Sequence, residues 1–300
     1  MKTPKATAIR LWKTLLWGLI YLGPRRDVTV DTFNGRLSFD SKDWLIGKYL
    51  YVRRSYECDL IREVLDLLRL EGYANTPGNG TVLDVGANLG MICIALLKHH
   101  HFERAIAFEP APNSYRLLVK NIEQNGLSHR ILHFPYALSS REAEMELELS
   151  GDNSGDHRIR QMTSGGFFRE NRRRTIRVKA KSLDRLLVEH PGLRTEQVAL
   201  IWLDIQGHEG WFLEGARDLL NRGIPIVSEF WPYAILRSGM SRPEFCRIVS
   251  GLFTHYYLLP ADRPEKLPIS RIDSLFDEYS RPREMCTVLL VRERQVSPRL

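Results

Sequence analysis

The stretch TVLDVGANLG, residues 81–90, determines the predicted fold. An apolar run, residues 81–85, carries Asp84 near its end, and Gly86 and Gly90 separate it from a second apolar stretch. Because glycine has no Cβ, it permits a tight turn and a close approach of a ligand to the backbone. We therefore predict a strand over residues 81–85, a glycine turn, and a helix over residues 88–98.

The rest of the chain repeats this alternation of short apolar runs and helical periodicity. Further strands are expected at residues 104–108, 130–137, 143–149, 174–180, 198–203, 224–230, 253–259 and 285–291. Further helices are expected at residues 57–70, 112–125, 182–188 and 209–221. This order predicts an α/β fold with a doubly wound, mostly parallel, seven-stranded Rossmann-like sheet and an antiparallel closing strand. Ligands of such folds bind beyond the carboxyl ends of the strands.

The first 75 residues are predicted to form an N-terminal helical and β-hairpin appendage, followed by the main domain over residues 76–295. Asn34-Gly35 is a strong hairpin dipeptide. Residues 9–23, IRLWKTLLWGLIYLG, are shorter than the roughly 20 apolar residues that span a bilayer. Two interpretations stay open for this helix: it packs on the domain or in a dimer, or its aromatic and basic residues lie in a membrane interface.

Bulk composition adds two expectations. The four cysteines, Cys58, Cys93, Cys246 and Cys286, lie too far apart in sequence for a metal-ligand pair, so we expect reduced thiols and a cytoplasmic location. The formal net charge is +7, and residues 169–174 hold four arginines. This run is either a solvated loop or a surface for an anionic partner.

The glycine turn does not match the dinucleotide fingerprint G-x-G-x-x-G. Counted from Gly86, that pattern requires glycine where this chain has Asn88 and Met91, so an NAD-dependent dehydrogenase is disfavoured. Asp84 in the same turn would repel a phosphate, whereas it suits a cationic ligand. S-adenosylmethionine (SAM) carries an ammonium and a sulfonium, and its carboxylate can meet backbone N–H groups at a helix start.

Three more acids follow apolar strands. Glu109 ends the second strand of the alternating series, where its two oxygens can accept hydrogen bonds from the hydroxyls of a ribose. Asp204 and Glu229 follow the next two long apolar runs. Four carboxylates at one sheet edge repel one another unless cations or hydrogen-bond donors lie among them, which favours a functional explanation.

These residues resemble the FkbM-type SAM-dependent O-methyltransferases, within the class I methyltransferases. The resembling pieces, from about residue 56 to residue 230, are SYE (55–57), LDVGANLG (83–90), AFEPAPNSYRLLVKNIEQNGL (107–127), ALS (137–139), NSG (153–155), SLDRLL (182–187) and LDIQGHEGWFLEGA (203–216). The last piece departs from the family pattern D-x-E-G-x-E, because Gln206 replaces an acid and His208 replaces a small residue.

The resemblance implies roles for individual residues. The cofactor-binding set would be Glu57, Asp84, Gly86, Ala87, Asn88, Gly90, Glu109, Asn113, Tyr136, Ala137 and Asp204. Within it, the turn residues would surround the methionine end of SAM, Glu109 would hold the ribose, and Tyr136 and Ala137 would border the adenine. Asn113 would cap the next helix or lie near the adenine.

Methyl transfer to an alcohol requires an aligned acceptor and a proton acceptor. The sequence favours His208 as the base, oriented by Glu209 or Asp204, with Glu229 nearby; the alternative is a structural histidine that bonds a neighbouring carboxylate. Alternatively, Asp204 and Glu229 could hold a divalent cation that lowers the pKa of the acceptor. This alternative is not favoured, because a clear third oxygen ligand is lacking, so no metal-binding residues are assigned.

The expected function is O-methylation of a sugar, glycolipid or secondary metabolite. Residues 152–157 form a polar loop that can reach the acceptor or can be an ordinary hairpin turn. A nucleic-acid methyltransferase is the first alternative, disfavoured because no Asn-Pro-Pro-aromatic motif follows Glu229. A noncatalytic SAM-binding module is the second. The sequence leaves the oligomeric state open.

Overall fold

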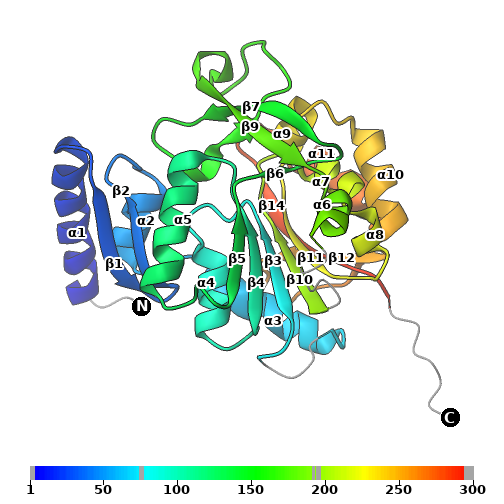
Figure 1. The fold of residues 1–300 in the computed structure, drawn as a ribbon, viewed down its shortest axis with the longest axis horizontal. Helices are drawn as coiled ribbons and strands as arrows, with labels where there is room; N and C mark the ends of the chain where they lie inside the picture. Colours follow the sequence, from blue (N-terminus) through cyan, green and yellow to red (C-terminus); the bar gives the residue numbers. More distant parts are fainter. Residues whose placement is uncertain (1–3, 74–77, 191–192, 194–196, 294–300) are drawn as a thin grey trace.

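The structure is a computed structural model that describes residues 4–73, 78–190, 193 and 197–293. Its main sheet has the strand order β13-β12-β14-β11-β10-β3-β4-β5. These strands are β3 (Thr81–Val85), β4 (Arg104–Phe108), β5 (Ile131–Phe134), β10 (Val198–Leu203), β11 (Ile226–Phe230), β12 (His255–Leu259), β13 (Leu267–Pro268) and β14 (Cys286–Val291). The predicted α/β class is confirmed (Figure 1).

The closing antiparallel pair of strands is found as predicted, but the number of strands in the main sheet differs from the prediction. β14 pairs antiparallel with both β11 and β12, whereas β10, β3, β4 and β5 are parallel neighbours. The sheet has eight strands rather than seven, because the two-residue β13 adds to its edge next to β12. Because β11, β10, β3, β4 and β5 run parallel, their carboxyl ends lie at one edge of the sheet.

Side chains of successive strand residues point to opposite faces of the sheet and build two cores. Val82 of β3 and Trp202 of β10 join one hydrophobic cluster, with α3 (Cys58–Leu70), α4 (Met91–Lys98) and α5 (Pro112–Gln124). Leu83 and Leu203 join the other, with residues of the remaining helices. Those helices are α6 (Leu183–Glu189), α7 (Glu209–Gly215), α8 (Arg217–Leu220), α9 (Pro232–Arg237), α10 (Arg242–Leu252) and α11 (Leu275–Glu278).

The N-terminal elements pack on the first of these cores. They are α1 (Pro4–Leu22), the hairpin β1 (Asp27–Thr32) and β2 (Gly35–Asp40), and α2 (Ile46–Arg53). Trp17 and Phe39 belong to the same buried cluster as Leu96 of α4. The buried Asn34 amide donates to the carbonyls of Tyr56 and Met91. The division at residues 75 and 76 stays a prediction. Among the described residues, no helix combines the length and the apolar character needed to cross a bilayer.

The predicted strand over residues 130–137 is wrong in its second half. β5 ends at Phe134, because Pro135 has no N–H to donate to a neighbouring strand. The chain then enters a second sheet, of order β6-β9-β7-β8, which lies above the strand ends of the main sheet in Figure 1. Its strands are β6 (Ala137–Leu138), β7 (Ala143–Leu149), β8 (Arg158–Ile159) and β9 (Arg174–Lys181).

Two predicted helices also differ from the structure. The helix expected over 88–98 begins at Met91, because Asn88 and Gly90 adopt positive φ angles of 48° and 80°. The helix expected over 209–221 is divided into α7 and α8 at Ala216. A Cβ on Gly215 would lie 2.0 Å from the carbonyl oxygen of Ser139, so α7 lies against the second sheet at that point.

Candidate active site

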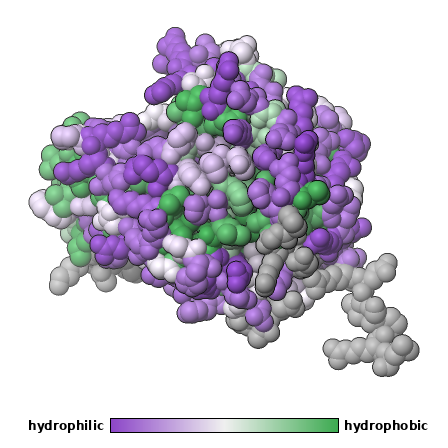
Figure 2. Space-filling view, viewed as in Figure 1, coloured by the Kyte–Doolittle hydropathy of each residue, from purple (hydrophilic) through white to green (hydrophobic). Residues whose placement is uncertain are grey.

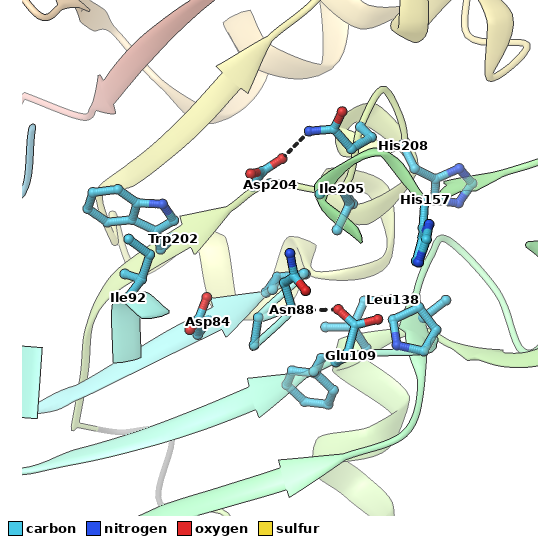
Figure 3. A pocket seen from close by; sticks show the side chains of 18 of the residues that line it. Asp84, Asn88, Ile92, Glu109, Leu138, His157, Trp202, Asp204, Ile205 and His208 are labelled. Atoms are coloured by element: carbon cyan, nitrogen blue, oxygen red, sulfur yellow. Dashed lines mark hydrogen bonds between the residues drawn. The ribbon is translucent and has the colours of Figure 1, made fainter. Parts of the chain in front are cut away.

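A pocket opens at the carboxyl ends of β3, β4 and β10, between the main sheet and the second sheet (Figure 3). Residues from the β3–α4 turn, the β4–α5 turn, β6 and the β10–α7 turn line it. The start of α3 and the loop before β8 complete the wall. Several of its polar groups are the acids and turn residues that the sequence singled out: Glu57, Asp84, Gly86, Asn88, Glu109, Asp204 and His208.

The glycine turn brings β3 into contact with the end of β10. Gly86 has a φ of +85°, and a Cβ there would lie 1.9 Å from the carbonyl oxygen of Asp204. Only glycine therefore fits this position. Asn88, at a φ of 48°, donates its backbone N–H to Glu109 Oε2 at 2.9 Å. The same backbone conformation leaves the buried Asn88 Oδ1 without a hydrogen-bond partner among the described residues.

Asp84 of β3 and Glu109, which directly follows the neighbouring strand β4, are both buried, and Figure 3 shows them in this pocket. Asp84 Oδ2 accepts from the backbone N–H of Cys93 at 3.1 Å, and Glu109 Oε1 accepts from that of Ala111 at 2.7 Å. Neither carboxylate forms an ion pair with a described lysine, arginine or histidine. Burial raises the pKa of Asp84 to about 6 and that of Glu109 to about 7.

Glu57 joins these acids from the other side of the pocket. It precedes α3 in the left-handed backbone region, with a φ of 49°. Burial and then the charges of Asp204 and Asp84 raise its pKa to about 8. Tyr56, which the sequence prediction missed, also lines the pocket, next to Glu57 in the chain. The SYE piece at residues 55–57 contained this tyrosine, but only the structure brings it near Asp204.

A second acid pair lies at the ends of β10 and β11, where the half-buried Asp204 follows β10 and the half-buried Glu229 lies within β11. The amide nitrogen of Gln206 donates to Asp204 Oδ1 at 2.5 Å and to Glu229 Oε2 at 2.9 Å. Figure 3 shows the Asp204 contact. Burial raises the pKa of Asp204 to about 6, and burial together with the Asp204 charge raises the pKa of Glu229. A neutral amide, rather than a cation, therefore lies between the two carboxyl groups. Glu229 itself is adjacent to the pocket but not among its lining residues.

His208 lines the pocket without the predicted carboxylate partner. Its Nε2 lies 2.9 Å from Ser139 Oγ, and its buried Nδ1 has no hydrogen-bond partner among the described residues. Burial lowers its pKa to about 3. The prediction that Glu209 or Asp204 orients His208 is wrong, because Glu209 Oε1 instead accepts from the backbone N–H groups of Ile205 and Gly207. Glu209 thereby closes the turn between β10 and α7.

The remaining predicted residues divide into two groups. Ala87, Tyr136 and Ala137 line the pocket, whereas Gly90 and Asn113 do not. Gly90 packs closely against Leu118 and Ile94, since a Cβ there would lie 2.7 Å and 3.0 Å from them. Asn113 is not the predicted cap, because α5 has Ala111 in that position. Its side chain instead contacts Asp40 at 3.4 Å and Arg116 at 3.1 Å.

The loop before β8 covers the pocket and contributes His157, which the prediction did not single out as a site residue. Ser154, Gly155 and His157 line the pocket. His157 Nδ1 accepts from the backbone N–H of Ser150 at 3.1 Å, so Nε2 carries the proton of the neutral ring. Burial lowers the pKa of His157 to about 4. This histidine can donate a hydrogen bond into the pocket at neutral pH.

Part of the arginine run holds this cover in place. Arg173 pairs with Asp156 at 2.5 Å, and the buried Arg158 pairs with Glu170 at 3.3 Å. The charge of Arg173 is therefore compensated within the chain. In the described part of the chain, no group of three or more histidine, cysteine, aspartate or glutamate side chains is arranged to hold a metal ion.

Comparisons with known proteins give a family and distant relatives. The family model described as the methyltransferase FkbM domain matches residues 84–257. Methyltransferase sdnD of Sordaria araneosa is 24% identical over 164 residues, which cover 48% of this chain and 63% of that protein. Methyltransferase 1 of Beauveria bassiana (strain ARSEF 2860) is 24% identical over 228 residues, covering 71% of this chain and 86% of that protein.

A solved structure, the methyltransferase FkbM from Methylobacillus flagellatus KT, has 13% sequence identity and a TM-score of 0.42. The match covers 73% of this chain and 45% of that chain. The chain thus matches less than two thirds of the length of both sdnD and this structure.

Proposed function

Because the chain belongs to the FkbM methyltransferase family, we propose that it transfers the methyl group of SAM to a hydroxyl group of a sugar, glycolipid or secondary metabolite. The observation that carries the cofactor assignment is a pocket whose buried carboxylates pair with no lysine, arginine or histidine in the described part of the chain. Like charges in a buried site are costly without a compensating cation. A positively charged nucleoside without phosphates meets that requirement.

The residues present fit this cofactor. Glu109 is the residue that would accept hydrogen bonds from ribose hydroxyls, and Asp84 and Glu57 would face the cationic methionine end. Asn88 Oδ1, buried without a described partner, is an acceptor that a ligand can satisfy. The Gly86 turn lets backbone approach closely, because no side chain fits there. When bound, SAM supplies an activated methyl group, and the chain's own residues align the acceptor and take its proton.

We propose that Asp204 accepts the proton of the hydroxyl group that is methylated. Its Oδ1 is held by Gln206, which leaves Oδ2 for an acceptor hydroxyl entering beside Gln206. Gln206 and Ile159 line both the cofactor pocket and a smaller adjoining cavity. We propose that the acceptor enters from the side of this smaller cavity. With a pKa of about 6, Asp204 is mostly ionised at neutral pH yet more basic than an ordinary aspartate.

We expect SAM binding to release protons near neutral pH. At about pH 7 the carboxyl groups of Glu57 (pKa about 8) and Glu109 (pKa about 7) are partly protonated in the free protein. A cation beside them favours the charged form, so their pKa values fall and protons leave. Calorimetry at about pH 7 in buffers of different ionisation enthalpy should show a buffer-dependent binding enthalpy, and affinity should weaken as the pH falls from about 8 to about 6.

The control is the same titration at about pH 9, where the carboxyl groups are ionised before binding and this carboxyl-linked proton release should vanish. Binding at about pH 7 with no proton release would contradict the proposed contact between cofactor and carboxylates.

The predicted catalytic role of His208 is tested by replacement with asparagine. Since the pKa of His208 is about 3 and its Nε2 contacts Ser139, we expect turnover to stay within about tenfold of the unmodified enzyme. Steady-state kinetics at saturating SAM are the measurement. A loss of about 100-fold or more with unchanged SAM affinity would return His208 to the role of the base.

The acceptor class is tested with methyl-labelled SAM. We expect label in hydroxyl groups of a glycan, glycolipid or small-molecule fraction of source-cell extract, with and without a chelator. Label in RNA or DNA would replace the proposal with nucleic-acid methylation. SAM binding with no labelled product in any fraction would favour a noncatalytic SAM-binding module. The cytoplasmic location expected from the cysteines stays a prediction.

A further inference from the structure

The first helix exposes an apolar face that no described part of the chain covers. On α1 the side chains of Leu11, Trp12, Leu15, Leu19 and Leu22 are 63%, 62%, 65%, 68% and 79% exposed. With 3.6 residues per turn these five positions fall on one side of the helix, which we call the apolar face of α1. Figure 2 shows hydrophobic residues at the edge of the molecule where α1 lies in Figure 1.

The opposite side fixes the orientation of the helix. Trp17 is fully buried, with its ring 5.6 Å from that of Phe39 and 5.5 Å from that of Tyr51. Gly47 makes room for it, because a Cβ there would lie 2.9 Å from the Trp17 ring. The ammonium group of Lys42 donates to the carbonyls of Tyr21 and Gly23 at the end of α1. The helix therefore cannot roll to bury its apolar face without losing these contacts.

The charged residues within the first 26 positions all have one sign. Residues 1–26 contain six lysines and arginines and no aspartate or glutamate: Lys2, Lys5, Arg10, Lys13, Arg25 and Arg26. Arg25 pairs with Asp40, whereas Arg10, Lys13 and Arg26 form no ion pair with a described residue. Asp27, the first acid along the chain, is held by Arg116 and Lys120. At 100° per residue, Arg10 and Lys13 lie on the side of α1 away from the apolar face, and Arg26 follows the helix. These unpaired cations give the segment a positive charge that can attract an anionic partner.

We propose that α1 binds the surface of an anionic lipid membrane through this apolar face. An apolar helix face that carries a tryptophan, on a segment whose charged residues are all basic, matches a helix lying in the plane of a membrane interface. A second copy of the chain fits less well, because a symmetric pair would bring two sets of basic residues together. This inference concerns where the protein binds and does not depend on the identity of the methyl acceptor.

The direct test is sedimentation of the full chain with lipid vesicles. We expect the chain to bind vesicles of phosphatidylcholine mixed with phosphatidylglycerol and to bind vesicles of phosphatidylcholine alone more weakly. Added salt should weaken the binding to the mixed, anionic vesicles. The variant Leu15→Glu with Leu19→Glu should lower the partition coefficient by about 100-fold or more, because two leucines no longer enter the interface. Replacing Arg10, Lys13 and Arg26 with glutamine should remove only the preference for anionic lipid.

A matched control carries the same kind of change elsewhere. Leu70 and Val188 are 76% and 81% exposed on α3 and α6, so Leu70→Glu with Val188→Glu should bind vesicles as the unmodified chain does. If circular dichroism shows that the α1 glutamate variant unfolds, Leu15→Gln with Leu19→Gln replaces it. Absent binding to anionic vesicles, or equal binding of the α1 and control variants, would overturn the proposal. So would a dimer that the α1 variant dissociates while vesicles remain unbound.

Discussion

Replacing Glu109 with alanine should weaken SAM binding by about 100-fold or more. The Glu109 carboxylate accepts the backbone N–H groups of Asn88 and Ala111, both within the two turns that line the pocket. Its removal leaves two buried donors unpaired, at a cost of roughly 1–3 kcal/mol each, and takes away the proposed acceptor for the ribose hydroxyls. Isothermal titration calorimetry with SAM measures the loss directly.

The matched control is Glu123→Ala, which removes an exposed glutamate from α5, the helix that follows Glu109. This variant should bind SAM as the unmodified protein does. Asp84→Asn should also lose affinity, because it removes a carboxylate while it keeps an acceptor for the Cys93 N–H. Unchanged affinity in both Glu109→Ala and Asp84→Asn would place the cofactor elsewhere.

Replacing Asp204 with asparagine should reduce turnover by about 100-fold to 10,000-fold while SAM affinity changes by less than about tenfold. The asparagine oxygen can still accept the Gln206 amide, so the turn after β10 is preserved. What is lost is the group that takes the acceptor proton. Single-turnover kinetics at saturating SAM separate this step from cofactor binding.

A structural role and a chemical role of Asp204 differ in their pH profiles. If Asp204 is the base, turnover of the unmodified enzyme should rise through the pKa of the Asp204–Glu229 pair, and the Asp204→Asn profile should lack that rise. Asp218→Asn, an exposed change on α8, should leave the profile intact. An Asp204→Asn enzyme with reduced turnover and an unaltered pH profile would show that Asp204 acts only on structure.

Local sequence patterns predicted most strands of the main sheet, among them β3, β4 and β10, which carry the site. The apolar runs that became β3, β4, β10, β12 and β14 are buried, and each could be identified without knowledge of its neighbours. The same holds for Asp84 and Glu109, because consecutive parallel strands joined by a helix place their ends at one edge. Gly86 was also identifiable, since a turn between an apolar strand and an apolar helix favours glycine.

Contacts between distant segments were not predictable in the same way. The bond from His208 to Ser139 spans 69 residues, and it depends on how the second sheet lies against α7. Gln206 was identified as a departure from the family pattern, but its bridge to Glu229 requires β10 and β11 to be neighbours in the right register. Tyr56 lines the pocket only because the hairpin and α3 pack beside α4. Each of these depends on tertiary packing rather than on local periodicity.

The position of Tyr56 and Glu57 has a consequence for shortened versions of this protein. Both residues precede the proposed start of the main domain at residue 76, yet they line the pocket proposed to bind the cofactor. A recombinant fragment cut at that boundary would keep the glycine turn and Glu109 but would leave the cofactor open to water on the Tyr56 side. Chimeras that exchange the N-terminal segment between related enzymes would likewise exchange part of the catalytic cavity, not merely a targeting element.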